Sequence, residues 1–464
     1  MSTPTLVRPV AARPGLALAL VLTCQLMLML DVTVMNVALP RIRADLGFTP
    51  AGLSWVMNAY TLVFGGLLLL GGRLGDLFGR RRVFLIGVAV FTAASLAGGL
   101  ADSAWQLIAA RIVQGLGAAA AGPSTIALIT STITEPRARV RALSLFSAMS
   151  SSGFAVGLIV GGLLTEWLSW RSVMFINVPL GLVVLLFGAR HIAEPARHPS
   201  RLDLPGAVTA TLGVGALVYG FIRAAEAGWG SATAVWSLSV GAVLVVVFVV
   251  LQTRITHPML PLRLFADRNR AAGYVNFFLG PLSMMSAFFF LTQFLQEIAG
   301  YGALVTGFAF LPMAAVLFGT SRLIPALLPR FGPKPLAASG TLMMAAGLWW
   351  LSSLSPGDGY LAAVLGPMLL MGVGGGLAFS PLNVVIMATV PPADAGAAGG
   401  VLQTMQQLGS TLGLAVLVTV AGSASRGAGG SAEDVLVAGM GAAFMVAAAV
   451  ALLTFFVALT FRRR

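Results

Sequence analysis

The sequence predicts an all-α polytopic membrane protein with fourteen transmembrane helices, arranged as two six-helix bundles plus a central two-helix hairpin. Three observations support this fold class: 58% of the 464 residues are hydrophobic, only 9% are charged, and apolar runs of about twenty residues recur along the chain. A soluble domain carries roughly 25% charged residues. Because backbone polar groups in lipid must be satisfied within their own segment, such runs are expected to be helices.

The apolar segments divide the chain into three parts. In chain order, the expected spans are 15–38, 51–71, 83–100, 105–126, 142–163, 172–189, 204–224, 233–251, 271–294, 303–321, 336–354, 360–381, 398–422 and 435–461. Six spans make an amino-terminal bundle over residues 1–190, two make a linker with the hairpin over 191–270, and six make a carboxy-terminal bundle over 271–464.

The distribution of charge predicts the topology. With the amino terminus inside, 22 of the 28 basic residues fall in inner segments, and Arg111 lies within a span. This is the positive-inside pattern, so the net charge of +13 requires no nucleic acid. A single lysine among many arginines, with abundant Ala and Gly, indicates a GC-rich bacterial genome. We therefore expect a multi-pass protein in the lipid bilayer of a bacterial cytoplasmic membrane, with both termini cytoplasmic.

Several classes of function lack the residues that they need. The only lysine, Lys334, is not part of a phosphate-binding loop, so no nucleotide is expected. The three histidines, His191, His198 and His257, all fall in inner loops, so no span offers a histidine for metal binding or hydrolysis. We expect no metal, no cofactor and no enzymatic activity. A membrane-embedded transferase is the less favoured alternative, because it would need a deep histidine or clustered acids.

The inner turn after the second span carries a recognisable motif. Residues 71–82 read Gly-Gly-Arg-Leu-Gly-Asp-Leu-Phe-Gly-Arg-Arg-Arg, which resembles the signature loop of the major facilitator superfamily, Gly-x-Leu-x-Asp-x-x-Gly-Arg-Arg. In that family the loop latches the two bundles on the inner side and opens during alternating access. The resemblance implies an inner gate made of Gly72, Asp76, Gly79, Arg80 and Arg81.

Further motifs narrow the resemblance to the fourteen-span drug/proton antiporters of the EmrB/QacA type. Residues 30–40 look like their first-span motif, residues 111–117 are similar to Arg-x-x-Gln-Gly-x-Gly, and residues 170–179 complete the set. The fifth span matches the antiporter pattern Gly-x-x-x-Gly-Pro-x-x-Gly-Gly, except that Leu158 replaces the proline. Its glycines, which can also serve plain close packing of helices, are Gly153, Gly157, Gly161 and Gly162.

This resemblance implies a function. We expect proton-coupled efflux of amphipathic small molecules, a drug or an antibiotic, across the cytoplasmic membrane by alternating access. A proton-coupled importer of a nutrient or metabolite with the same fold is the alternative.

Asp31 and Arg111 are the expected proton-coupling residues. An ionised side chain at the centre of a membrane helix costs about 2.5–3.5 kcal/mol, so each needs a partner. Asp31 lies shortly before the outer end of the first span and Arg111 shortly after the outer start of the fourth, so both sit about 10 Å below the outer surface. Asp31 would carry the proton beside Arg111, with Asn36 and Gln114 as supporting polar groups. A static ion pair that only helps assembly is the other interpretation.

The second bundle offers amides and aromatic rings, which suit an apolar pocket for amphipathic compounds. Packing between helices is the alternative role for each of them. The candidate substrate-cavity residues are Asn276, Phe289, Gln293, Asn383, Gln403 and Gln407.

Overall fold

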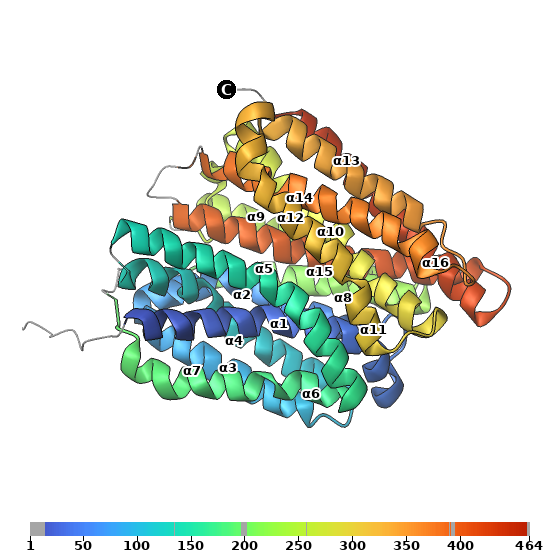
Figure 1. Ribbon diagram of the computed structural model, residues 1–464, viewed down its shortest axis with the longest axis horizontal. Coiled ribbons are helices and arrows are strands. Elements are labelled where there is room, and N and C mark those ends of the chain that lie inside the picture. The colour runs from blue at the N-terminus through green and yellow to red at the C-terminus, as the bar shows by residue number, and fades with distance from the viewer. Residues whose placement is uncertain are drawn as a thin grey trace, which may run out of the picture.

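The computed structural model describes residues 14–133, 135–195, 202–256, 258–388, 390 and 395–461, and all secondary structure there is helical (Figure 1). The elements are α1 (Pro14–Leu46), α2 (Ser54–Phe78), α3 (Arg80–Gly99), α4 (Ala104–Thr132), α5 (Pro136–Trp167), α6 (Trp170–Phe175), α7 (Asn177–His191), α8 (Leu204–Ala227), α9 (Ala232–Arg254), η1 (Leu262–Phe265), α10 (Arg268–Gln293), η2 (Phe294–Ile298), α11 (Ala303–Ala309), α12 (Leu311–Phe331), α13 (Pro333–Leu351), η3 (Tyr360–Val364), α14 (Leu365–Ala388), α15 (Ala395–Gly427) and α16 (Ala432–Leu459).

Each expected span lies, to within three residues at its ends, in one helix or in two consecutive helices. By length and composition, however, only twelve helices in the described part of the chain could cross a membrane. The two segments outside this set are α5 and α13. The described side chains of α5 give an apolar stretch of only Ala155–Trp167. Helix α13 has 19 residues, and Lys334 stands between two prolines at its start. Helix length and composition therefore do not by themselves establish a count of fourteen spans.

The helices pack as two groups joined by a hairpin. In the first group, α1 packs on α5 and α7, while α4 packs on α2 and α3; in the second, α10 packs on α15 and α16, and α13 on α14 and α16. In Figure 1 the first group is coloured blue to green and the second yellow to red. Helix α8 packs on α9, α2 and α15, and therefore touches both groups. The hydroxyl of Thr419 on α15 donates to the Phe221 carbonyl of α8 at 2.6 Å.

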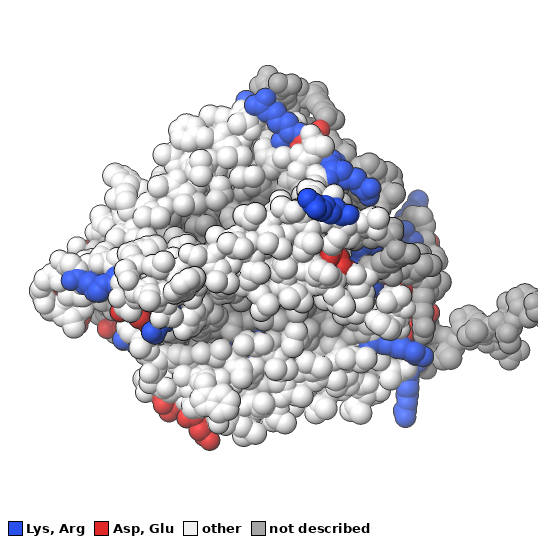
Figure 2. Space-filling model, turned by 180° about the vertical axis from the view of Figure 1, so that it is seen from behind, with Lys and Arg blue, Asp and Glu red and all other residues white. Residues whose placement is uncertain are grey.

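The outer surface of the helices is apolar. Helix α9 exposes Trp236, Val243 and Val246 at 72%, 60% and 62% of their surface. Figure 2 shows a broad uncharged area across the molecule, with most of the visible Lys and Arg toward the right-hand edge. An apolar face of this size is unfavourable in water and favourable in lipid, which fits a multi-pass membrane protein.

The two groups of helices are joined by polar contacts at the ends that the charge distribution predicts to be outer. From α1, Asn36 donates to Thr292 at 2.8 Å, the Val37 carbonyl accepts from Gln296 at 2.9 Å, and Arg43 forms an ion pair with Glu297 at 2.7 Å. We name the side chains of Asn36, Arg43, Thr292, Gln296 and Glu297 the outer clasp. A second contact joins α5 to α11, where the Glu166 carboxylate accepts from the Ala303 amide at 2.6 Å. Any opening of the outer side must break these bonds.

We expect Arg43→Gln to loosen the outer side, because it removes the ion pair that joins α1 to η2. A cysteine at position 303, in a background where Cys24 is Ala, should then react faster with an impermeant maleimide added outside. Ala303 is 1% exposed in the closed arrangement. Arg223→Gln is the matched control, since its ion pair with Glu226 stays within α8. Equal labelling rates in both variants would show that the Arg43 ion pair does not hold the outer side closed.

Candidate functional site

A buried ion pair lies between α1 and α4. Nη1 of Arg111 is 2.5 Å from Oδ2 of Asp31, and both side chains have no exposed surface. The equal depth of the two residues in their spans predicted this pairing. Because removing charges from water is costly, a buried pair persists only if further hydrogen bonds satisfy its remaining polar atoms.

Side chains from three helices supply most of those hydrogen bonds, although Nη2 of Arg111 is buried without a partner. Oδ1 of Asp31 accepts from Gln114 at 3.0 Å and from Asn177 at 2.9 Å. Gln114 also accepts from Arg111 at 2.9 Å and donates to the Ser95 hydroxyl at 2.7 Å. Gln114 follows Arg111 by three residues, a spacing that places both on the same face of α4.

The Arg111 guanidinium has two further contacts, both from α2. Its Nε donates to the Val56 carbonyl at 2.9 Å, and its central carbon lies 4.4 Å from the centre of the Tyr60 ring. The carbonyl and the ring face stabilise the cation. Arg111 is therefore held by α1, α2 and its own helix.

The sequence analysis missed three members of this site: Ser95, Tyr60 and Asn177. Asn177 belongs to the segment 170–179, which supported the family resemblance but received no role. Asn177 is the first residue of α7, and the packing of α7 on α1 places its amide against Asp31. Neither Ser95 nor Tyr60 stands out in the sequence, because single hydroxyls in apolar helices are common.

Asn36, expected to support the Asp31–Arg111 pair, does not join it. Its amide donates instead to Thr292 at 2.8 Å and to the Phe288 carbonyl at 3.3 Å, both on α10. The reason is helical periodicity: five residues at 3.6 per turn place Asn36 roughly 140° around α1 from Asp31. The first-span motif thus contributes to contacts on two faces of α1.

The expected inner-gate residues lie at the end of α2, at Gly79 and at the start of α3. Asp76 accepts from Nε and Nη2 of Arg80 at 3.1 and 2.8 Å. Gly79 permits this turn because its φ is +107°, a region that other residues rarely adopt. A Cβ added to Gly72 would make only ordinary contact, 3.6 Å from Pro123. Among the described residues, the Asp76–Arg80 pair stays within the amino-terminal group of helices.

The sequence analysis also missed Glu194, which follows α7 and holds the same turn. Its carboxylate accepts from the backbone amides of Arg81 and Arg82 at 3.0 and 3.3 Å. These amides are at the start of α3, where backbone donors lack partners within the helix and the helix dipole favours a negative charge. More than a hundred residues separate Glu194 from the turn, so no local signal could have indicated this contact.

The four glycines of the fifth-span motif are all at close contacts between helices. A Cβ on Gly157 would lie 1.8 Å from the Thr33 hydroxyl, and one on Gly161 would lie 2.7 Å from Cα of Val34. Gly153 similarly faces α1, whereas Gly162 faces Ala303 of α11 across the two groups. Helix α5 continues without interruption through Leu158. The glycines therefore let α1 and α11 approach α5 closely.

The candidate substrate-cavity residues differ in burial. Phe289 is 1% exposed and packs edge-to-face with Phe290, so it belongs to the apolar core. Gln293 donates to a carbonyl of its own helix at 3.3 Å, as does Asn276 at 3.1 Å, although Oδ1 of Asn276 has no partner. Asn383 is exposed.

Gln403 and Gln407, the two remaining cavity candidates, are half-buried on α15. Gln407 closely approaches Gly65 of α2, so this part of α15 faces the other bundle.

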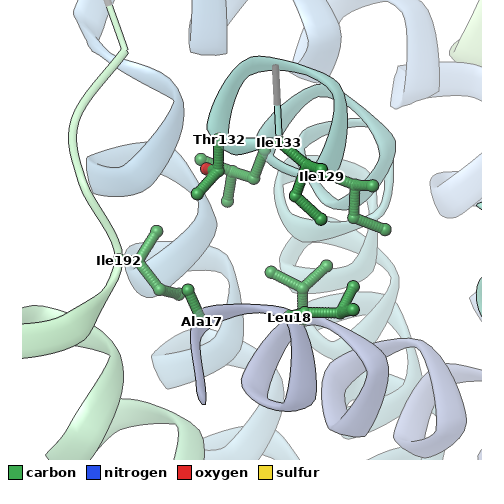
Figure 3. Close-up of a pocket in the computed structure, with 8 residues that line it drawn as sticks. Ala17, Leu18, Ile129, Thr132, Ile133 and Ile192 are labelled. Atoms are coloured by element: carbon green, nitrogen blue, oxygen red, sulfur yellow. The ribbon is translucent and has the colours of Figure 1, made fainter. Parts of the chain in front are cut away.

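One small apolar pocket lies at the inner ends of α1 and α4 (Figure 3). Ala17, Leu18, Ile129, Thr132 and Ile192 are among its lining residues. Leu18 precedes Asp31 by thirteen residues, or about 20 Å along α1. The pocket is therefore remote from the ion pair, and its lining carries no charged group.

The histidines give no sign of a metal site. His191 ends α7 and is half-buried, whereas His198 and His257 lie outside the described residues. Among the residues that the structure describes, no three His, Cys, Asp or Glu side chains come together in a way that could hold a metal ion.

Comparison with known proteins identifies the family. Residues 21–414 match the model of the Major Facilitator Superfamily. The chain belongs to this superfamily. Membership confirms the resemblance that the inner-turn motif indicated, and it makes the protein a transporter and not an enzyme.

Relatives within the superfamily carry names of exporters and resistance proteins. The chain is 45% identical to the cephamycin export protein CmcT of Amycolatopsis lactamdurans, over 89% of this chain and 86% of that one. It is 41% identical to the puromycin resistance protein pur8 of Streptomyces alboniger, over 88% and 82%. The tetracenomycin C resistance and export protein of Streptomyces glaucescens is 34% identical, over 87% and 75%.

Solved structures of the superfamily share the fold. A point mutant of the nucleoside transporter NupG superposes with a TM-score of 0.69 at 13% identity, covering 96% of this chain and 99% of that one. The inward open xylose transporter XylE from E. coli superposes with a TM-score of 0.63 at 14% identity, covering 97% and 96%. At these identities the likeness concerns the fold alone.

Proposed function

We propose that this superfamily member exports an amphipathic, antibiotic-like small molecule in exchange for protons, by alternating access across the bacterial cytoplasmic membrane. The observation that carries the proton coupling is the fully buried Asp31–Arg111 pair between two helices of one bundle. Export, and not the import that the same fold can also perform, is favoured by relatives named for cephamycin export and for resistance to puromycin.

Asp31 is the proposed proton carrier. In the closed arrangement its carboxylate receives three donors, from Arg111, Gln114 and Asn177. An ionised carboxylate can accept all three, because it is an acceptor only. Exchange requires that water reach Asp31 when the outer clasp opens, so that a proton can displace part of this hydrogen bonding. Arg111 then loses its counter-charge, and the unpaired buried charge favours a change of conformation.

The proposed topology has fourteen spans, with α5 and α13 counted, and both termini in the cytoplasm. It is supported by the packing of α5 on α1 and α11 and of α13 on α14 and α16, which makes both helices integral parts of their bundles. The proposed bundle boundaries at 190/191 and 270/271 lie within a few residues of the end of α7 and the start of α10. We place the substrate between the bundles, where α15 presents Gln403 and Gln407 toward α2.

The deciding experiment uses inverted membrane vesicles that contain the full chain. A panel of β-lactam, aminonucleoside and aromatic polyketide compounds is offered with and without an imposed pH gradient. We expect at least one compound to accumulate only when the interior is acidic, with proton release that follows its addition. Accumulation that ignores the pH gradient would contradict proton coupling, and accumulation in right-side-out vesicles under an inward proton gradient would support the importer.

The inner gate provides a prediction of its own. In the proposed cycle, Asp76→Asn slows transport, because the neutral amide weakens the bond to Arg80 that shapes the turn between α2 and α3. Insertion and expression should remain near normal, since this pair is partly exposed. Initial transport rates in vesicles measure the effect. Asp358→Asn, in an exposed loop before η3, is the control, and wild-type rates in both variants would remove Asp76 from the gate.

A further inference from the structure

We infer that Asn177 is a positioning residue for the proton on Asp31: its amide donates to the ionised carboxylate and turns to accept from the protonated one. This inference rests on the proposed function, in which Asp31 carries the proton. It adds the first residue of α7 to a site otherwise built from α1, α2, α3 and α4.

Protonation changes what Asp31 needs from its neighbours. The ionised carboxylate is an acceptor only, and it is satisfied by Arg111 on Oδ2 and by two amides on Oδ1. A proton added to Oδ1 turns that atom into a donor, which then faces the NH₂ groups of both amides. Because the site is fully buried, an O–H without an acceptor is unfavourable. One of the two amides must therefore present its oxygen.

Gln114 is not free to turn. Its Oε1 accepts from Arg111 at 2.9 Å, and its Nε2 donates to Ser95 at 2.7 Å as well as to Asp31. Rotation of this amide would place its NH₂ group against the guanidinium and would break two bonds besides the one to Asp31.

Asn177 lacks this restraint. Its Nδ2 donates to Asp31 at 2.9 Å, whereas its Oδ1 is buried and has no hydrogen-bond partner. A half-turn of the amide exchanges these two atoms and breaks no other bond. The ionised carboxylate holds the NH₂ group toward itself, and the protonated carboxyl holds the oxygen. The orientation of the Asn177 amide thus follows the protonation of Asp31.

Other titratable groups near Asp31 do not provide this acceptor. Arg111 from α4 pairs with Asp31, Tyr60 from α2 lies beside this pair, and Cys24 lies seven residues before Asp31 on α1, about 10 Å along the helix. The guanidinium only donates. The Tyr60 ring lies against Arg111, and its hydroxyl has no hydrogen-bond partner and so does not contact Asp31. The buried Cys24 thiol is a weak hydrogen-bonding group.

The test is infrared difference spectroscopy on the full chain in liposomes, comparing an acidic with an alkaline medium. Wild-type protein should show a protonated-carboxyl band that Asp31→Asn lacks, together with difference bands of a side-chain amide. Asn177→Leu keeps the side-chain size and should displace the carboxyl band while removing the amide bands. Asn276→Leu is the matched control, because that amide is also buried with an unpaired oxygen but lies on α10.

Asn177→Ser provides a second variant in case Asn177→Leu does not fold. A hydroxyl both donates and accepts, so transport should keep a pH profile near that of wild type while the amide bands vanish. A carboxyl band that survives in Asp31→Asn would overturn the proton carrier and, with it, the inference. A band that depends on Asp31 but keeps its position in Asn177→Leu, with the amide bands intact, would overturn the role of Asn177 alone.

Discussion

Replacing Asp31 with Asn is expected to abolish proton-driven efflux. The amide has nearly the size of the carboxyl group but binds no proton at working pH, so the exchange loses its carrier. Substrate binding and downhill exchange can continue, because the space between the bundles is unchanged. Drug-induced proton release and uptake driven by a pH gradient, both in proteoliposomes, measure the loss.

Asp203→Asn is the matched control for Asp31→Asn, because it changes another buried acid. Asp203 is 4% exposed and accepts from Gly206, Gln252 and Met259 at the base of the hairpin. Its replacement should lower stability without affecting coupling. If Asp31→Asn still moves protons at the wild-type stoichiometry, another acid carries them. Glu297 and Glu226 would then be tested next.

Replacing Arg111 with Ala is expected to destabilise the fold itself. The change leaves the Asp31 carboxylate buried without a counter-charge, and breaking a buried pair from one side costs about 3–5 kcal/mol. It also leaves the Val56 carbonyl and Oε1 of Gln114 without the donor that each has in the wild type. Thermal unfolding of the purified protein in detergent, followed by fluorescence, should show a clearly lower midpoint than that of wild type.

A double variant separates charge from packing at this position. Adding Asp31→Asn to Arg111→Ala removes the unpaired charge, so the double variant should unfold at a higher temperature than Arg111→Ala alone. This non-additivity is expected for residues in direct contact. Equal midpoints for the single and double variants would mean that lost packing around the guanidinium, and not the unpaired carboxylate, causes the instability.

The sequence predicted the ion pair but only part of the site around it. Depth along a helix can be counted from residue numbers, which is why Asp31 and Arg111 could be paired. The direction in which a side chain points around a helix also follows from residue numbers. It explains, once the structure is known, why Asn36 reaches α10. Residue numbers do not show which helices pack against each side of α1. They therefore could not show that Asn177 would contact Asp31.

The inner gate and the substrate cavity likewise depend partly on local sequence and partly on contacts between helices. The turn at Gly79 was visible as a motif, because glycine and a charge cluster act locally. The carboxylate that caps α3 comes from Glu194, after four further helices, and only the packing of α7 on α3 places it there. Phe289 was a candidate for the substrate cavity, and the structure places it in the apolar core, where aromatic residues are equally suited by composition.

By itself, the sequence determined the membrane setting, the helical class and the family, since these depend on composition, on the length of apolar runs and on local motifs. It also determined that one acid and one arginine lie deep in the membrane and need partners. Tertiary structure decided which partners they obtain, where the outer clasp forms and which amide is left with an unpaired oxygen. These depend on contacts between helices distant in sequence, and interactions of that kind leave no periodicity along the chain from which they could be read.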